Sequence, residues 1–235
     1  MIDTAILLAA GAGTRLRSAA DSKPLCPVGG KPLIDHAIER IAAAGIARVI
    51  VVTGYRAEAI EAHLASRDWP ASVETARSAD WQQPNGVSAL AAAPLLDGAE
   101  ALLAMCDHLV TPPLYARMAQ AGSGTGLTLG IDRRLGHPWV DPLDVTCVAT
   151  QGDRIVAIGK KMEPHDCYDT GVFAVGQPFF DALAALNAPS ITEAVRALAI
   201  EQRAGIVDCS DLDWIDVDDP KALAAAEGWL ANGRT

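Results

Sequence analysis

The sequence has 235 residues, of which half are apolar and a fifth are charged, so its composition excludes a disordered chain. A net charge of −10 argues against a nucleic-acid-binding surface, because such surfaces gather Lys and Arg to neutralise phosphates. The chain is long enough to bury a full core, and we expect residues 1–235 to form a single domain.

The five cysteines lie far apart and form no CxxC pair, which is typical of reduced thiols in a cytoplasmic protein rather than of a disulfide framework or a zinc site. The N-terminus offers only a short apolar stretch that includes Asp3, unlike a signal peptide. No apolar run approaches the roughly 18 residues that a membrane span needs. We therefore expect a cytoplasmic protein without membrane insertion.

The first half of the chain alternates predicted strands and helices. Short apolar, often β-branched runs predict strands at residues 4–8, 48–53, 72–76 and 101–106. Apolar residues at helical spacing predict helices at residues 32–44, 57–66 and 86–93. This βαβ repetition predicts a Rossmann-like α/β fold, with a mostly parallel sheet and helices on both faces.

After Gly122 the pattern changes. Strands are predicted at residues 126–131, 145–149, 155–158 and 171–175, without long helices between them. They indicate a mixed sheet edge and a small β-rich lid lobe over the first sheet. Helices are predicted at residues 178–185, 192–200 and 220–230. The last of these helices is rich in alanine and could be the interface of a homodimer.

The strongest local motif follows the first predicted strand and supplies most of the candidate nucleotide-binding residues, which are Leu8, Ala9, Ala10, Gly11, Ala12, Gly13, Thr14 and Arg15. Gly11 and Gly13 allow the backbone to pass close to a bound group, and their N–H groups can cradle phosphate oxygens. Arg15 and Lys23 add fixed cations for a triphosphate. The cations therefore cluster where a polyanion would need them.

Two other interpretations of this loop are a plain structural turn and a dinucleotide site. Leu16 stands where a GxGxxG motif has its third glycine, and the chain lacks the GK[ST] sequence of a P-loop. Gly29, Gly30 and Lys31 fit a tight turn before a helix, and we treat them as structural.

A second group of candidates is acidic. Asp107 follows the predicted strand at residues 101–106, at the sheet edge where ligands bind in open parallel sheets. Asp216 and Asp218 are two residues apart and share a face if that stretch is extended. Carboxylates from distant segments suit Mg²⁺, with Asp107 and Asp216 favoured over Asp218. Asp219 precedes Pro220 and is predicted to cap the last helix.

Residues 5–54 resemble the start of the nucleoside-diphosphate-sugar pyrophosphorylases, whose signature is a Gly-x-Gly-Thr-Arg loop followed by Lys-Pro-Leu, here at residues 23–25. The remainder is similar to CTP:inositol-1-phosphate cytidylyltransferases over five segments, at residues 85–90, 107–108, 158–160, 166–171 and 214–218. The resemblance covers almost the whole chain. It departs at Cys106 and at Pro84, where glycine is common in relatives.

The resemblance implies a fold of the nucleotide-diphospho-sugar transferase type and a cytidylyltransferase that uses Mg²⁺, an NTP and a phosphorylated alcohol. It implies that Asp107 and Asp216 hold Mg²⁺ and that Lys23 contacts the NTP phosphates, with Arg15, Lys23, Asp107 and Lys160 as the catalytic group. Asn85, Gly86 and Ser88 would lie near the base and ribose. Lys160 would meet the acceptor phosphate, beside Asp169, Thr170 and Gly171. Fused relatives continue into a membrane synthase domain, so the lipid-forming step would belong to another protein.

Three rival functions remain at this point. A phosphocholine transferase would need an aromatic cage, for which the Trp and Tyr residues are dispersed. A hexose-1-phosphate transferase would, like one for inositol-1-phosphate, use polar groups such as Asp132, Asp141, Asp169 and Thr170. A catalytically silent, nucleotide-binding regulatory protein would have no use for Lys160. His108, beside Asp107, could touch a ligand.

Overall fold

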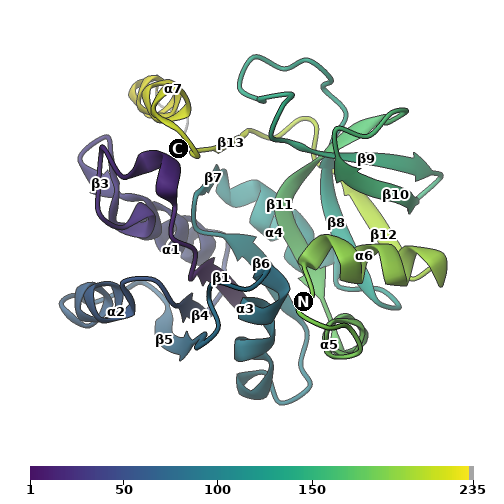
Figure 1. Ribbon diagram of the computed structural model, residues 1–235, viewed down its shortest axis with the longest axis horizontal. Helices are drawn as coiled ribbons and strands as arrows, with labels where there is room; N and C mark the ends of the chain where they lie inside the picture. The colour runs from purple at the N-terminus through teal and green to yellow at the C-terminus, as the bar shows by residue number, and fades with distance from the viewer. Residues whose placement is uncertain (233–235) are drawn as a thin grey trace.

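The computed structural model describes residues 1–232 and is built on a nine-stranded sheet (Figure 1). The strand order is β5-β4-β1-β6-β11-β8-β12-β10-β9. In chain order these strands are β1 (Thr4–Ala9), β4 (Arg48–Thr53), β5 (Ser72–Arg77), β6 (Ala101–Met105), β8 (Leu127–Asp132), β9 (Thr146–Gln151), β10 (Arg154–Lys160), β11 (Cys167–Val175) and β12 (Ala204–Asp208). The first four in sheet order are parallel, whereas β11 runs antiparallel to both β6 and β8.

Helices cover both faces of this sheet (Figure 1). One face carries α1 (Leu33–Ala43), α2 (Ala57–Ala65) and α4 (Pro112–Ala121), and the other carries α3 (Asn85–Ala92), α5 (Gln177–Ala184) and α6 (Ile191–Ile200). Side chains alternate along a strand, so Ile6 and Leu8 of β1 pack under the second group of helices while Leu7 packs under the first. The predicted α/β fold with helices on both faces is confirmed.

The strands expected to form a mixed sheet edge and a lid lobe all belong to this one mixed sheet. β8, β11 and β12 continue it beyond β6, and β9 and β10 form its far edge. β12 is parallel to β8 and lies where no element was predicted. By pairing with β6, the strand β11 joins the two halves into one sheet, which leaves fewer exposed strand edges than two sheets would.

Helix α4 also lies where no element was predicted. Pro112 and Pro113 stand in its first turn, where a missing N–H costs nothing because the helix has no partner for it. Leu114, Tyr115 and Met118 are buried against the sheet. The pair of prolines therefore begins this helix rather than excluding it.

The C-terminal helix α7 (Pro220–Ala231) lies beside the N-terminal segment, next to the short strands β2 (Pro27–Val28) and β3 (Lys31–Pro32) (Figure 1). Trp229 and Ala226 pack with Leu16 and Leu33 in a separate apolar cluster. The predicted cap is confirmed, since the Asp219 carboxylate accepts a hydrogen bond of 2.7 Å from the backbone N–H of Ala222. This packing holds helix α7 against the loops that follow β1.

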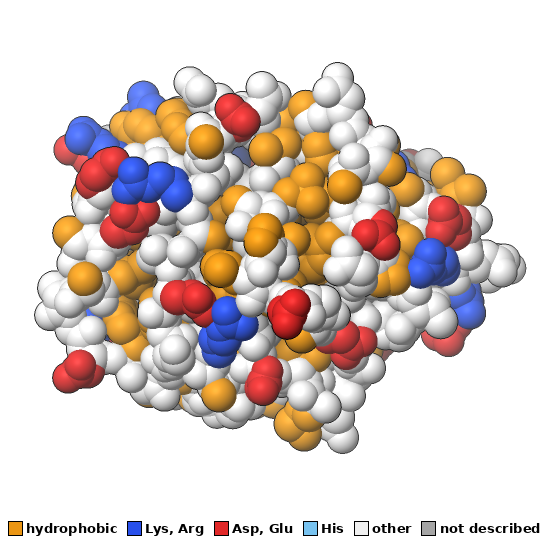
Figure 2. Space-filling view, turned by 90° about the horizontal axis from the view of Figure 1, so that it is seen from below, with side chains coloured by type: hydrophobic (Ala, Val, Ile, Leu, Met, Phe, Trp, Pro, Cys, Tyr) orange, Lys and Arg blue, Asp and Glu red, His pale blue; other side chains and the backbone are white. Residues whose placement is uncertain are grey.

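None of the helices in the described part of the chain combines the length and the apolar character that crossing a membrane requires. All five cysteines are buried and unpaired. Figure 2 shows one face of the molecule, on which hydrophobic side chains gather near the middle and many Lys and Arg side chains lie next to Asp or Glu.

Candidate active site

The candidate residues gather at the carboxyl edge of the parallel strands. Asp107 follows β6 after Cys106, and the glycine loop follows β1. A two-stranded pairing of β7 (His108–Val110) with β13 (Trp214–Asp216) then places Asp216 opposite His108. Figure 1 shows this pair between helix α7 and the loop that precedes β9. Residues more than a hundred positions apart thus meet beside Asp107.

Two cavities open at this edge. The larger has a volume of about 360 Å³, and among the predicted residues its lining includes Arg15, Asn85, Asp107, Lys160, Asp169, Gly171, Asp216 and Asp218. The smaller has a volume of about 200 Å³, and its lining includes Leu8, Ala9, Gly11, Gly13, Lys23, Asp107 and Asp218. The cavities meet at Asp107 and Asp218, which line both. Most of the predicted residues therefore surround one continuous site.

Lys23 is the buried cation of the site, with only 6% of its surface exposed. Its ammonium donates to Asp107 Oδ2 over 2.6 Å and to Asp218 Oδ1. Burial lowers the pKa of Lys23, but the attraction of Asp107 and Asp216 outweighs burial, so the pKa lies above its usual value. Gly13, with φ of +53°, is needed here because a Cβ on it would lie 2.3 Å from Lys23 Cβ. The glycine loop is thus packed directly onto the phosphate-binding candidate.

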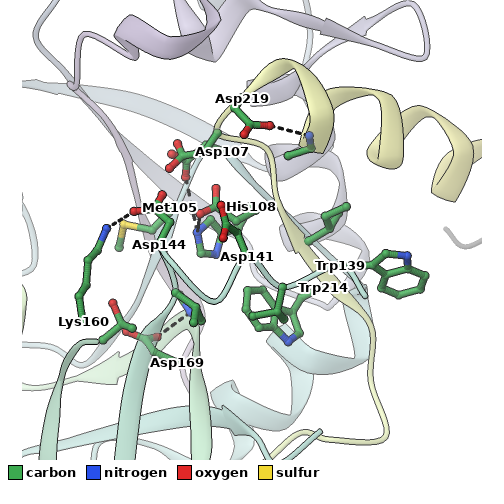
Figure 3. A pocket seen from close by; sticks show the side chains of 18 of the residues that line it. Met105, Asp107, His108, Trp139, Asp141, Asp144, Lys160, Asp169, Trp214 and Asp219 are labelled. Atoms are coloured by element: carbon green, nitrogen blue, oxygen red, sulfur yellow. Dashed lines mark hydrogen bonds and ion pairs between the residues drawn. The ribbon is translucent and has the colours of Figure 1, made fainter. Parts of the chain in front are cut away.

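Asp144 links the other two cations. Its Oδ2 accepts a hydrogen bond of 2.7 Å from Arg15 Nη2, and its Oδ1 accepts one from Lys160 Nζ (Figure 3). Arg15 also donates to Asp218. The hydrogen bonds of Lys160 and Arg15 hold the pKa of Asp144 below its usual value, against the opposing effect of burial. In the free protein each candidate phosphate-binding cation is therefore paired with a carboxylate.

The carboxylates of Asp107, Asp216 and Asp218 form an acidic cluster, and His108 lies between this cluster and Trp214 (Figure 3). Its ring stacks on that of Trp214 with 5.8 Å between centroids and an interplanar angle of 23°. Burial lowers the pKa of His108, but Asp216 and Asp107 outweigh it and raise the pKa to about 9. On the other side of the ring, Nδ1 lies 3.0 Å from the carbonyl oxygen of Thr170.

Neighbouring residues of the segment around Thr170 point in different directions, some toward the larger cavity and one into the core. Gly171 lines the larger cavity and has φ of +78°, and Asp169 Oδ1 accepts a hydrogen bond of 2.7 Å from its N–H. Burial raises the pKa of Asp169 to about 6. The Thr170 hydroxyl instead points into the core, where it donates to the carbonyl of Gly130 over 2.8 Å. Asp169 and Gly171 therefore line the larger cavity, whereas the Thr170 side chain faces the core.

Several predicted nucleotide-binding residues lie outside the lining of both cavities, namely Ala10, Ala12, Thr14, Gly86 and Ser88. Ser88 is buried, and its hydroxyl donates to Ser78. Asn85 does line the larger cavity, and its Oδ1 accepts a hydrogen bond of 3.0 Å from the Ile191 N–H. Of the three residues of α3 predicted to lie near the base and ribose, only Asn85 lines a cavity.

Asp132, considered as an acceptor-binding residue, is a structural carboxylate. It is 1% exposed, and its two oxygens accept hydrogen bonds from the Arg134 guanidinium and from Trp214 Nε1. Asp141 does line the larger cavity. Asp132 therefore holds Trp214 behind the site instead of contacting a ligand.

The acidic residues fit a divalent cation. Ligand atoms of Asp107, His108 and Asp216 lie within 4.8 Å of one another, and the same holds for Asp144, Asp216 and Asp218. Asp216 Oδ1 is buried and has no hydrogen-bond partner among the described residues, which is costly unless something else satisfies it. Carboxylate oxygens at this spacing are the donors that Mg²⁺ prefers.

Sequence reasoning missed Asp144 and Lys221, both of which line the larger cavity. Asp144 gave one weak signal, since it is an acid placed directly before a predicted strand at residues 145–149. Lys221 stands in the first turn of α7, where a surface lysine is commonplace. Trp139 and Trp214 also line this cavity and were noted only as dispersed aromatic residues.

Comparison with known families identifies the fold and the general chemistry. Residues 5–204 match the model of the MobA-like NTP transferase domain. The chain belongs to this family. The MobA-like domain thus covers the glycine loop, Lys23, Asp107 and Lys160, while Asp216 and Asp218 lie after the matched residues.

Relatives of this MobA-like domain include two bifunctional IPC transferase and DIPP synthase proteins. The one from Rubrobacter xylanophilus is 32% identical over 97% of this chain, and the one from Aquifex aeolicus is 27% identical over 98%. The chain spans about half the length of each, 53% and 52%. Among solved structures, the inositol-1-phosphate CTP transferase from T. maritima superposes with a TM-score of 0.86 at 22% identity, over 100% of this chain and 98% of that one. A UDP-glucose pyrophosphorylase bound to UDP-glucose superposes with a TM-score of 0.80 at 18% identity, over the whole of both chains. These structures share the fold of this chain.

Proposed function

We propose that this NTP transferase joins CTP to inositol-1-phosphate with Mg²⁺ and releases pyrophosphate. One observation carries the proposal: Arg15, Lys23 and Lys160 converge with the acidic cluster on two cavities that meet at Asp107. The choice of CTP and of inositol-1-phosphate is supported by the names of the Rubrobacter and T. maritima proteins.

The reaction needs no general base. An oxygen of the acceptor phosphate attacks the α-phosphorus of CTP, and the bond from that phosphorus to the oxygen bridging to the β-phosphate breaks. Pyrophosphate leaves with the bridging oxygen. A phosphate monoester has a second pKa near 6, so the attacking oxygen is already anionic at neutral pH. The obstacle is the repulsion between two polyanions, which positioned cations reduce.

The three cations supply that positioning. Arg15 and Lys23 flank the glycine loop and would bind the triphosphate, while Lys160 at the end of β10 would bind the acceptor phosphate. In the free protein they are held by Asp144, Asp107 and Asp218. The carboxylates therefore orient the cations before a ligand binds. Substrate phosphates would then replace the carboxylates as partners of these cations.

Asp107 and Asp216 would hold Mg²⁺, with Asp218 as a further carboxylate. The Asp216 oxygen that has no partner in the described chain supports this placement. Bound there, the ion would neutralise phosphate charge in the transition state. In the free protein, the buried Lys23 ammonium contacts Asp107 beside this position.

The acceptor side of the larger cavity favours a polyol over choline. Asp141 and Asp169 line it, and carboxylates accept hydrogen bonds from hydroxyl groups. A choline cage needs open aromatic faces, but Trp214 is 4% exposed and one face stacks on His108. The residues therefore support a hydroxylated acceptor.

The test is pyrophosphate release with Mg²⁺, in a grid of four NTPs against inositol-1-phosphate, phosphocholine and glucose-1-phosphate. The proposal predicts a signal with CTP and inositol-1-phosphate well above every other pair. A signal with another pair would contradict the choice of substrates but would still support nucleotidyl transfer as the reaction. Nucleotide binding without pyrophosphate from any pair would favour the regulatory alternative.

Several expectations remain predictions. They are the single domain over residues 1–235, the cytoplasmic location, the homodimer and the absence of nucleic-acid binding.

A further inference from the structure

The orientation of His108 is fixed by its neighbours. Nδ1 lies 3.0 Å from the Thr170 carbonyl, which can only accept, so Nδ1 carries the hydrogen and donates it. Stacking on Trp214 and the cross-strand pairing with Asp216 hold the ring plane. Nε2 is therefore directed to the opposite side of the ring, toward the acidic cluster.

The distances from Nε2 do not fit direct hydrogen bonds. Nε2 lies 3.6 Å from Asp216 Oδ2 and 3.9 Å from Asp107 Oδ1, beyond the usual hydrogen-bond range. They do fit groups that share an ion, because two ligands each about 2.1 Å from one metal are about 3.0 to 4.2 Å apart. The three residues form one of the two clusters with metal-ligand spacing in the described chain.

The backbone of Gly171 keeps this arrangement possible. A Cβ on Gly171 would lie 2.3 Å from His108 Nδ1, so any other residue would displace the ring. The contact of Nδ1 with a backbone carbonyl is also the arrangement commonly found behind metal-binding histidines, where it fixes the tautomer and the ring orientation. The surroundings of His108 thus match those of a ligand.

We infer that His108 Nε2 is a ligand of the divalent cation, together with Asp107 and Asp216. The inference rests on the metal site of the proposed function. It adds that the site is not purely oxygen-based: an imidazole favours ions such as Mn²⁺ or Co²⁺ over Mg²⁺. An ion bound there replaces any proton on Nε2.

Electron paramagnetic resonance on the unaltered protein tests this directly, with Mn²⁺ alone as the probe and without substrates. A bound imidazole gives a ¹⁴N hyperfine coupling in the electron spin echo, and ¹⁵N-labelling of histidine must change that coupling. Mn²⁺ that binds without histidine nitrogen coupling would overturn the inference. Because no reaction is measured, this outcome is independent of whether the proposed substrates are correct.

A variant gives the second measurement. His108→Asn keeps a donor for the Thr170 carbonyl but removes the atom at Nε2. The control is His165→Asn, since His165 Nδ1 also lies against a backbone carbonyl, at 2.9 Å from Met162, and lines neither cavity. Calorimetry should show Mn²⁺ affinity weakened by about 10-fold or more in His108→Asn only, with a smaller loss for Mg²⁺. Unchanged Mn²⁺ affinity in a folded His108→Asn protein would contradict the inference.

Discussion

At the scale of single residues, the site is a set of opposite charges that satisfy one another. Lys23 is buried and keeps a raised pKa because Asp107 and Asp216 compensate for lost solvent. Asp144 pairs with both Arg15 and Lys160 at the more exposed mouth of the site. A chain with net charge −10 can thus present cations to a polyanion, because they are concentrated and oriented at one edge.

Replacing Lys160 should affect one substrate more than the other. Lys160→Ala removes a charge-assisted contact to the acceptor phosphate, and the acceptor KM should rise about 10-fold to 100-fold while the CTP KM changes little. Steady-state kinetics with each substrate varied in turn measures the two values. The adjacent Lys161, which lines neither cavity, supplies the control variant Lys161→Ala. Equal increases in both KM values would remove Lys160 from the acceptor side.

Gly171 should tolerate no side chain. Gly171→Ala forces alanine into a φ of +78° and pushes its Cβ into His108. The left-handed backbone alone costs an alanine about 1–2 kcal/mol, so the free energy of unfolding should fall by more than this amount. Gly152→Ala is the matched control, because Gly152 has φ of +63° but no atom within 4 Å of an added Cβ. Urea unfolding compares the two. A loss in Gly171→Ala no larger than in Gly152→Ala would show that His108 moves aside freely.

How far the sequence predicts the site depends on what places each side chain. Asp107 could be predicted from its place after the strand β6, Lys23 from the Lys-Pro-Leu motif that follows the glycine loop, and the cap at Asp219 from Pro220. Asp144 could not be predicted, because its contacts depend on how the loop at residues 133–145 folds back on Arg15 and Lys160. The Thr170 side chain was misplaced because the resemblance assigns three consecutive residues of β11 to the site, whereas neighbouring side chains of a strand point to opposite faces.

At the scale of elements, the pairing of β7 with β13 completes the site. Each strand has three residues, too few for a periodic pattern, and the pairing joins positions 108–110 to 214–216. Long runs such as β1, β4 and α1 were predicted closely because their burial is visible as local periodicity. Pairings between distant short strands leave no such local signal. The sequence therefore offered Asp216 and His108 as separate candidates but did not predict that they pair.

Helix α7 follows β13, and its start depends on Asp219. Asp219→Ala removes the side-chain acceptor for the Ala222 N–H and should lower the free energy of unfolding by about 1 kcal/mol. Asp219→Asn keeps a capping oxygen, so its free energy of unfolding should fall clearly less than that of Asp219→Ala. Urea denaturation of both variants measures the difference. Equal losses would mean that the charge near the cavity, not the cap, accounts for the effect.

At the scale of the whole molecule, one sheet carries both sides of the site. Its parallel half supplies the glycine loop and Asp107, while β10 and β11 of the mixed half supply Lys160 and Asp169. The strands predicted as a lid are joined to the rest by backbone hydrogen bonds, so both substrates would bind against one continuous framework. The two phosphates would therefore meet at the Asp107 end of the sheet.

The most direct test of this account is the turnover of Asp107→Asn with CTP, inositol-1-phosphate and Mg²⁺. Lys23 keeps its contact with Asp218 in this variant, so the fold should persist, as circular dichroism can verify. Pyrophosphate release should fall by at least about 100-fold, whereas Asp97→Asn, at an exposed position outside both cavities, should match the wild type. Normal turnover by folded Asp107→Asn would contradict the placement of the catalytic metal and with it the central claim.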